Sequence, residues 1–178
     1  MYASLVSFCD QQLGRVLDVF DEHNLWQDTL LLVNTDHGFL MGEHDWWAKV
    51  VTPFFQEVAH IPFWIYDPRV PECVNTTSQA LAQTIDLAPT VLDYFDIPVP
   101  PDMQGRRLLD AMLGDDAIRS ASLYGVMGGQ VNVTDGRYVY MRGSATNPYS
   151  SDPATMTWPG SLRRSPGLTG TISPPLFR

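Results

Sequence analysis

The chain has 178 residues, a formal net charge of −9 and 44% hydrophobic residues, which is enough apolar content for the core of one ordinary domain. The acidic balance and the lack of a Lys/Arg-rich run argue against a nucleic-acid or anionic-membrane partner. No stretch of the sequence approaches the roughly 20 apolar residues that a membrane-spanning helix needs.

The first predicted element is an amphipathic helix over residues 2–23. Its apolar residues recur at steps of three and four, the spacing of one buried helix face: Tyr2, Leu5, Cys9, Leu13, Val16, Leu17 and Phe20. Asn24 suits the C-terminal cap of this helix. The apolar run at residues 30–33 then predicts a strand buried on both faces. A helix followed by such a strand is typical of an α/β protein with a parallel sheet.

Residues 38–59 are rich in Gly, Trp and charge, and they predict a long loop beside a functional site. A second core strand is expected over residues 61–66. Asp86 occupies the N-cap position of a helix that would end near Phe95. Asp86 is therefore expected to cap this helix and not to bind a metal.

The last third of the chain has the pattern of antiparallel strands. Residues 121–127 are strand-like, and alternating runs at 131–134 and 137–141 flank Asp135-Gly136. This pattern predicts a β-hairpin with a type I′ turn. Residues 143–178 show no periodicity, so we expect them to be disordered or wrapped on a partner surface.

Asp36 and His37 follow directly after the predicted strand at residues 30–33. Ligands of open α/β sheets bind at the carboxyl ends of strands, and Asp with His is an ordinary ligand pair for a divalent metal. An isolated Asp-His-Gly is more often a turn in which the Asp caps backbone amides. The pair alone therefore leaves both interpretations open.

The wider stretch resembles the sulfatase family of the alkaline-phosphatase superfamily. The resemblance rests on Asp-His-Gly at 36–38, Gly-Glu-His at 42–44 and Trp-Ala-Lys at 47–49, in this order. Asp-Leu-Ala-Pro-Thr at 86–90 and Gly-Arg-Arg-Leu-Leu at 105–109 are similar to two later landmarks of the family.

The resemblance implies an α/β fold in two parts. Residues 1–114 would be the C-terminal part of an alkaline-phosphatase-like parallel-sheet core that carries the metal and sulfate-site residues. Residues 115–178 would be a small antiparallel subdomain with an irregular tail. In this interpretation Asp36 and His37 are metal ligands, with calcium as the first choice. Manganese and zinc are alternatives, because imidazole suits softer cations.

The same resemblance implies roles for two further residues. Lys49 would bind the sulfate group of a sulfated small molecule or glycan. His44 would orient the sulfate or assist proton transfer to the leaving oxygen. Alternatively, His44 only braces the loop, with Glu43 fixing its tautomer.

Weaker candidates are two adjacent pairs. Trp46 and Trp47 cannot both face inward on a regular element, so one could pack while the other stacks on a sugar or aryl ring. Arg106 and Arg107 could contact an anionic substrate, although exposed loop arginines without such a role are commoner.

The family's nucleophile motif, Cys or Ser followed by x-Pro/Ala-x-Arg, does not occur in this sequence. We therefore expect a C-terminal fragment. The intact protein would hydrolyse sulfate monoesters through a formylglycine in an N-terminal region that is missing here, and the isolated chain would be inactive. The alternatives are a phosphonate or phosphate ester hydrolase of the same superfamily, or a non-catalytic fragment with a vestigial anion site. A divided core would expose apolar surface, so self-association is also expected.

Overall fold

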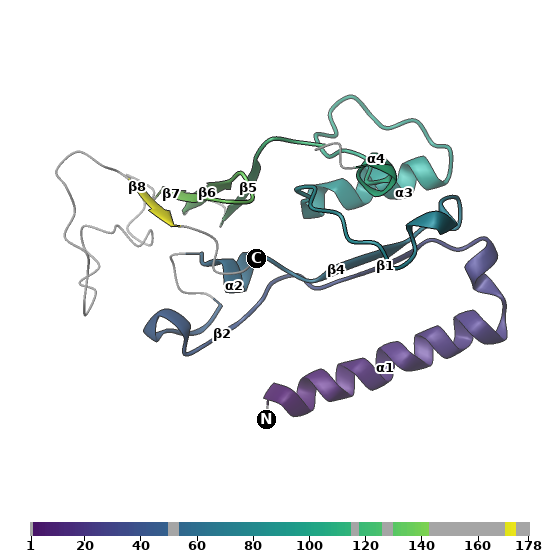
Figure 1. Cartoon of the computed structure of the whole chain (residues 1–178), viewed down its shortest axis with the longest axis horizontal. Helices are drawn as coiled ribbons and strands as arrows, with labels where there is room; N and C mark the ends of the chain where they lie inside the picture. Colours follow the sequence, from purple (N-terminus) through teal and green to yellow (C-terminus); the bar gives the residue numbers. More distant parts are fainter. Residues whose placement is uncertain (1, 50–53, 115–117, 126–129, 143–169, 174–178) are drawn as a thin grey trace. The chain divides into compact units, whose positions relative to one another are not determined.

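The computed structural model describes residues 2–49, 54–114, 118–125, 130–142 and 170–173 (Figure 1). The chain divides into two compact units, one of residues 1–33 with 63–76 and one of residues 34–62 with 77–178. Within the described ranges, no helix is long and apolar enough to span a membrane. The α/β class predicted from the sequence is confirmed.

The first unit contains α1 (Tyr2–Glu22), the 3-10 turns η1 (Leu25–Gln27) and η3 (Pro71–Cys73), and the strands β1 (Leu31–Asn34) and β4 (Phe63–Tyr66). The two strands pair with each other, as Figure 1 shows. Trp26 links the helix to β4, because its ring lies 4.8 Å from that of Phe20 and 4.9 Å from that of Tyr66. The Tyr66 hydroxyl also donates a hydrogen bond of 2.6 Å to the Trp26 carbonyl.

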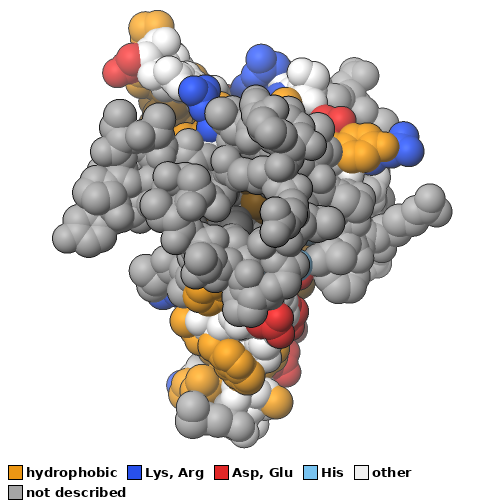
Figure 2. Space-filling view, turned by 90° about the vertical axis from the view of Figure 1, so that its left-hand side faces the viewer, with side chains coloured by type: hydrophobic (Ala, Val, Ile, Leu, Met, Phe, Trp, Pro, Cys, Tyr) orange, Lys and Arg blue, Asp and Glu red, His pale blue; other side chains and the backbone are white. Residues whose placement is uncertain are grey.

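The predicted first helix is confirmed, and Asn24 ends it in the left-handed conformation, at φ 54°. The prediction that its apolar face is buried is wrong. Of the residues in α1, only Phe20 is buried, whereas Leu5 and Phe8 are 56% and 59% exposed. Figure 2 shows hydrophobic side chains on the surface of α1, the lowest segment in the view. Among the described elements, α1 packs mainly against η1, the turn that directly follows it, so most of the helix has no neighbouring element to cover it.

The predicted core strands form close to their expected positions, but β1 is not buried on both faces. Its three apolar residues are only half-buried, and Trp64 in β4 is 62% exposed. A pair of strands cannot cover both of its own faces, which explains the difference. The parallel order expected for the main sheet stays a prediction.

The second unit begins with the loop that the sequence predicts. This loop contains the short hairpin strands β2 (Leu40–Met41) and β3 (Trp47–Ala48), the turn η2 (Glu43–Asp45) and the helical turn α2 (Gln56–Ala59). Further along, η4 (Thr84–Asp86) leads into α3 (Leu87–Tyr94), as expected, and α4 (Leu109–Leu113) follows.

A four-stranded antiparallel sheet completes the second unit, in the order β5 (Ser122–Gly125), β6 (Val131–Thr134), β7 (Val139–Arg142) and β8 (Gly170–Ser173). The separate antiparallel sheet is therefore confirmed. The expectation of an irregular tail is wrong for residues 170–173, which pair with β7. The rest of the tail lies outside the described residues. The division at residue 114 stays a prediction.

The predicted hairpin is confirmed, but its turn is not a two-residue type I′ turn. Thr134 pairs with Val139, so the loop has four residues. The Asp135 carboxylate accepts hydrogen bonds from the backbone N–H groups of Arg137 at 2.9 Å and Tyr138 at 2.7 Å. These bonds hold the pKa of Asp135 below its ordinary value. An Asp that satisfies two loop amides makes the longer turn stable.

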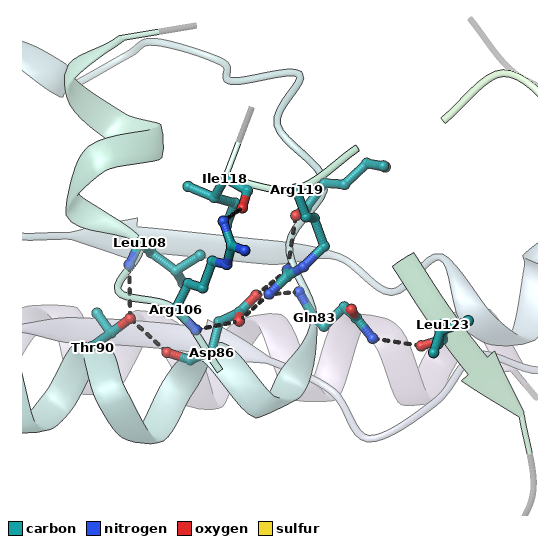
Figure 3. A network of polar contacts seen from close by, with 9 residues as sticks. Gln83, Asp86, Thr90, Arg106, Leu108, Ile118, Arg119 and Leu123 are labelled. Atoms are coloured by element: carbon teal, nitrogen blue, oxygen red, sulfur yellow. Dashed lines mark hydrogen bonds and ion pairs between the residues drawn. The ribbon is translucent and has the colours of Figure 1, made fainter. Parts of the chain in front are cut away.

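Asp86 is buried in a polar network and does not cap α3 with its side chain, contrary to the sequence prediction (Figure 3). Its carboxylate accepts hydrogen bonds from the backbone N–H groups of Gln83 at 2.7 Å and Arg106 at 2.9 Å. The Arg119 guanidinium binds both carboxylate oxygens at 2.5 Å. Desolvation raises the pKa of Asp86, but Arg119 and the two N–H donors outweigh it, so the pKa lies below its ordinary value.

Candidate active site

Asp36 and His37 lie just beyond the end of β1, and their side chains converge. The His37 Nε2 atom is 3.2 Å from an Asp36 carboxylate oxygen, and the His37 backbone N–H donates to the other oxygen at 3.0 Å. The Asp36 side chain is 79% exposed, so the point where the two side chains meet is open to solvent. This geometry agrees with the expected pair, and its role as a metal site stays a prediction.

The ring of His37 is held in one orientation. Its Nδ1 atom lies 2.9 Å from the Gly38 carbonyl, and its Nε2 atom is hydrogen-bonded to the Lys49 ammonium. Nε2 faces both a donor, the Lys49 ammonium, and an acceptor, the Asp36 carboxylate, so its own contacts do not assign the proton. The Gly38 carbonyl only accepts hydrogen bonds, so in the neutral ring the proton is on Nδ1 and Nε2 has the lone pair. The nitrogen beside Asp36 is therefore the one that can bind a cation.

The charges at this point stabilise an ionised carboxylate. Desolvation raises the pKa of Asp36, but the charge of a protonated His37 ring, hydrogen bonds from the backbone N–H groups of His37 and Asp36, and the Lys49 ammonium outweigh it and lower the pKa below its ordinary value. Asp36 is thus an anion across the physiological pH range. Asp36, His37 and Lys49 bring an anion, a lone pair and an ammonium to one exposed position.

Lys49 reaches this position because the hairpin β2–β3 folds the loop back. Leu40 pairs with Ala48 and Met41 pairs with Trp47, and Leu40 is fully buried. Three residues of the turn between the strands have a positive φ: Gly42 (120°), His44 (57°) and Asp45 (62°). Ala48, just before Lys49, also has a positive φ, of 88°. Clusters of such residues occur where surrounding contacts hold a strained backbone for function.

His44 belongs to a second group in the same loop. Its Nε2 atom lies 3.1 Å and 3.3 Å from the two carboxylate oxygens of Glu57, and its ring stacks on Phe55 with centroids 3.8 Å apart. Glu43 does not fix the His44 tautomer, because its carboxylate instead accepts the backbone N–H of Met41 at 2.5 Å. The predicted pairing of His44 with Glu43 is therefore wrong, and Glu57 is the partner of His44.

The helical turn α2 joins the two groups. The Gly38 N–H donates to the Val58 carbonyl at 2.8 Å, and a Cβ atom at residue 38 would overlap the Glu57 carbonyl oxygen. A glycine is thus required directly after His37, because the backbone of α2 packs against it. Val58 itself is 1% exposed.

The small antiparallel sheet anchors the start of this segment. The Phe54 N–H donates to the Gln130 side chain at 3.0 Å, and the Phe54 carbonyl accepts from the Asn132 amide at 3.0 Å. Gln130 and Asn132 are both buried. Asn132 in β6 and Gln130 just before it therefore fix the backbone of the residue that precedes Phe55.

The weaker candidates have different surroundings. Trp46 is half-buried and Trp47 is 68% exposed, so one tryptophan of the pair packs and the other faces solvent. Arg106 donates to the Ile118 carbonyl, and Arg107 pairs with Asp93 and Asp110. Both arginines have structural partners in the second unit.

Sequence reasoning missed Glu57. It is the sole acidic residue between Asp45 and Asp67, within a segment of mostly apolar residues. An isolated carboxylate in such a segment is a signal for a specific partner, because unpaired charges are rarely buried.

Comparison with known proteins assigns the family. The sulfatase family model matches residues 1–97, which is more than half of the chain. The chain belongs to the sulfatase family. A likeness in fold agrees: a protein solved in complex with its substrate D-glucosamine-2-N,6-O-disulfate superposes with a TM-score of 0.66 at 24% identity, over 78% of this chain and 30% of that one.

Two curated relatives are similar to this chain in sequence. An N-acetylglucosamine-6-O-sulfatase of Bacteroides thetaiotaomicron is 32% identical over 107 residues, which are 60% of this chain and 19% of the relative. A multifunctional alkaline phosphatase superfamily protein of Trinickia caryophylli is 32% identical over 108 residues, which are 61% of this chain and 21% of the relative. The chain thus spans about a fifth of the length of these two relatives.

Proposed function

We propose that this chain carries the metal- and sulfate-binding part of a sulfatase that hydrolyses sulfate monoesters. The observation that carries the proposal is the convergence of Asp36, His37 and Lys49 at one exposed position. Membership of the sulfatase family supports the reaction type.

Asp36 and His37 fit a divalent cation. Their Oδ2 and Nε2 atoms are 3.2 Å apart, and two ligand atoms bound at right angles to one ion at about 2.0–2.4 Å would be separated by roughly 3 Å. Among the described residues, no third His, Cys, Asp or Glu completes a cluster with them. We propose calcium first, with manganese or zinc as alternatives. The bound cation would supply Lewis-acid polarisation of the sulfate group.

Lys49 and His44 would act on the sulfate ester. The Lys49 ammonium takes the Nε2 lone pair of His37 here, and a cation on that lone pair would leave the ammonium for a sulfate oxygen. A fixed positive charge stabilises the negative charge that grows on oxygen in the transition state. His44 would orient the ester or pass a proton to the leaving oxygen.

The formylglycine nucleophile of the family mechanism would come from outside residues 1–178, because the motif that forms it is not in this sequence. Hydrolysis therefore requires residues beyond this chain, and we expect these 178 residues to bind but not to turn over a sulfate ester. This expectation concerns the isolated chain and not a longer protein that includes it.

The substrate class we propose is a sulfated sugar. The relative from Bacteroides thetaiotaomicron is named as an N-acetylglucosamine-6-O-sulfatase, and the solved structure holds a sulfated glucosamine. Trp47, exposed on β3 two residues before Lys49, offers a flat apolar face of the kind on which a sugar ring stacks.

A second candidate is hydrolysis of a phosphate or phosphonate ester. The relative from Trinickia caryophylli favours it, because that protein is named as a multifunctional member of the alkaline phosphatase superfamily. The same Asp-His pair would serve either oxyanion. A non-catalytic chain with a vestigial anion site is the third possibility.

The test is ligand binding by the isolated chain in the presence of calcium. Titration with D-glucosamine 6-sulfate should give saturable chemical-shift changes at His37 and Lys49, which Asp36→Asn abolishes. Asp45→Asn, a loss of charge in the same loop, should leave the changes intact. Unsulfated glucosamine should give none. Stronger binding of glucosamine 6-phosphate would favour the phosphate ester reaction, and no calcium-dependent change with either ligand would contradict the proposed site.

A further inference from the structure

Glu57 has a role that the metal and sulfate positions do not require. Its carboxylate meets the Nε2 atom of His44 at 3.1 Å and 3.3 Å, thirteen residues away in the sequence. The Glu57 side chain is 15% exposed and the His44 side chain 29% exposed. A carboxylate that is mostly removed from water and faces one imidazole is a specific partner, unlike a solvated surface pair.

The His44 ring is restrained from two further directions. The backbone of His44 is left-handed, at φ 57° and ψ 23°, which sets the direction of its Cβ atom. The Phe55 ring lies against the imidazole with an interplanar angle of 10°. The Glu57 carboxylate and the Phe55 ring thus contact the imidazole from two directions.

Glu57 is itself fixed by its own segment. The neighbouring Val58 carbonyl accepts the Gly38 N–H, and the Phe54 backbone is bound at both ends by Gln130 and Asn132. The backbone that carries Glu57 is thus tied to the loop that carries Asp36 and His37. A flexible glutamate could not orient a ring, whereas one held in this way can.

We propose that Glu57 is a positioning residue that fixes the His44 imidazole with its proton on Nε2. An ionised carboxylate only accepts hydrogen bonds, so the nitrogen that faces it must carry the proton. Nδ1 of the neutral ring then has the lone pair and can accept a proton, and only a ring that has taken up this proton would pass it on to a leaving oxygen. Carboxylate–histidine pairs set tautomer and basicity in this way in metal and catalytic sites.

The role of Glu57 rests on the proposed function in one respect, the reaction in which His44 would take part. The position and tautomer of the ring do not depend on sulfate or metal binding. A failure of the sulfate-binding test would leave this assignment intact, and a failure of the test below would leave the metal and sulfate positions intact.

The test is the protonation pattern of His44 in the 178-residue chain labelled with 15N-histidine, measured above neutral pH by long-range proton–nitrogen correlation. We expect a protonated Nε2 and a bare Nδ1 in the natural chain. Glu57→Gln keeps the side-chain shape but can donate as well as accept, so both nitrogen resonances should shift toward the values of a mixed tautomer. Glu72→Gln, an exposed change in η3, is the matched control and should leave them unchanged.

Two results would overturn the proposal. One is a proton on Nδ1 of His44 in the natural chain, which needs no variant to observe. The other is a folded Glu57→Gln chain whose His44 nitrogen resonances equal those of the natural chain. A structural role of Glu57 that acts only on loop stability would not move the tautomer.

Discussion

Asp86 is a fully buried carboxylate whose charge is balanced by Arg119, a side chain that is only 10% exposed. Removing one partner of such a pair leaves a buried charge uncompensated, which costs about 3–5 kcal/mol. We therefore expect Arg119→Met to lower the free energy of unfolding by an amount in this range. Urea denaturation followed by amide signals from α3 measures it.

Arg107→Met is the matched control. Arg107 is half exposed and pairs with Asp93 and Asp110 at 3.3 Å and 3.0 Å. Exposed pairs contribute about 0–1 kcal/mol, so this variant should cost no more than that. Equal losses for the two arginine variants would contradict the central place that Asp86 has in this unit.

The pH dependence of the Arg119→Met effect has a defined sign. The folded pKa of Asp86 lies below its ordinary value, so its contribution to stability is present above about pH 4 and is lost as the pH falls through the folded pKa. Without Arg119 this contribution is largely gone at neutral pH. The difference in unfolding free energy between the natural chain and Arg119→Met should therefore shrink below pH 4. A difference that stays constant or widens there would refute this account.

A glycine is needed at position 38 because there is no room for a Cβ atom, and not because of its backbone conformation. A methyl group at this position would overlap the Glu57 carbonyl oxygen, which is backbone and cannot rotate away. We expect Gly38→Ala to destabilise the second unit by about 1–3 kcal/mol, the usual cost of overpacking. It should also shift the His37 and His44 ring signals, because α2 must move.

Gly14→Ala provides the opposite control. No atom lies within 4 Å of a Cβ placed at Gly14, inside α1. Alanine in a helix interior is better than glycine by about 0.5–1 kcal/mol, so this change should stabilise α1. A Gly38→Ala chain as stable as the natural one would show that α2 does not pack against the Asp-His-Gly turn as described.

At the scale of elements, regular patterns in the sequence predicted most of the fold. The three- and four-residue spacing gave α1, the short apolar runs gave β1 and β4, and the alternating runs gave the β6–β7 hairpin. These signals are local, so they survive in a single sequence. The resemblance of the Asp-His-Gly and Trp-Ala-Lys segments to the sulfatase family likewise singled out Asp36, His37 and Lys49 as residues of one site, and the structure brings their side chains together.

The contacts missed by the sequence are those made between distant segments. Glu57 meets His44 across 13 residues, and Asp86 meets Arg119 across 33 residues. Neither pairing has a periodic signature. The short strand β8 has no periodic signature either, because it forms by pairing with the edge of β7. The type I′ turn predicted at Asp135 was wrong. The Asp135 side chain accepts hydrogen bonds from two backbone N–H groups of the loop, and these bonds stabilise a four-residue turn instead.

At the scale of the whole molecule, α1 exposes an apolar surface. The exposed residues include Leu5, Val6, Phe8, Val16 and Val19. Large apolar patches are rare on soluble monomers. The chain also spans only about a fifth of the length of the two relatives described above. We therefore propose that the isolated chain self-associates through α1.

Analytical ultracentrifugation tests this proposal. Phe8→Glu should weaken self-association at least about tenfold, because a buried aromatic side chain contributes well over 1.4 kcal/mol. Gln11→Glu adds the same charge at an exposed polar position of the helix and should have little effect. A natural chain that is strictly monomeric at high micromolar concentration, with one cooperative thermal transition, would contradict the proposal.

The measurement that tests the account most directly is where manganese binds. In a histidine-labelled chain, Mn²⁺ bound by Asp36 and His37 should broaden the His37 ring signals at concentrations that leave His23 and His60 sharp. Asp36→Asn should abolish this selectivity, and Asp45→Asn should preserve it. Equal broadening of His23, His37 and His60, or selective broadening of His37 that survives Asp36→Asn, would contradict the claim that these two residues form a metal site.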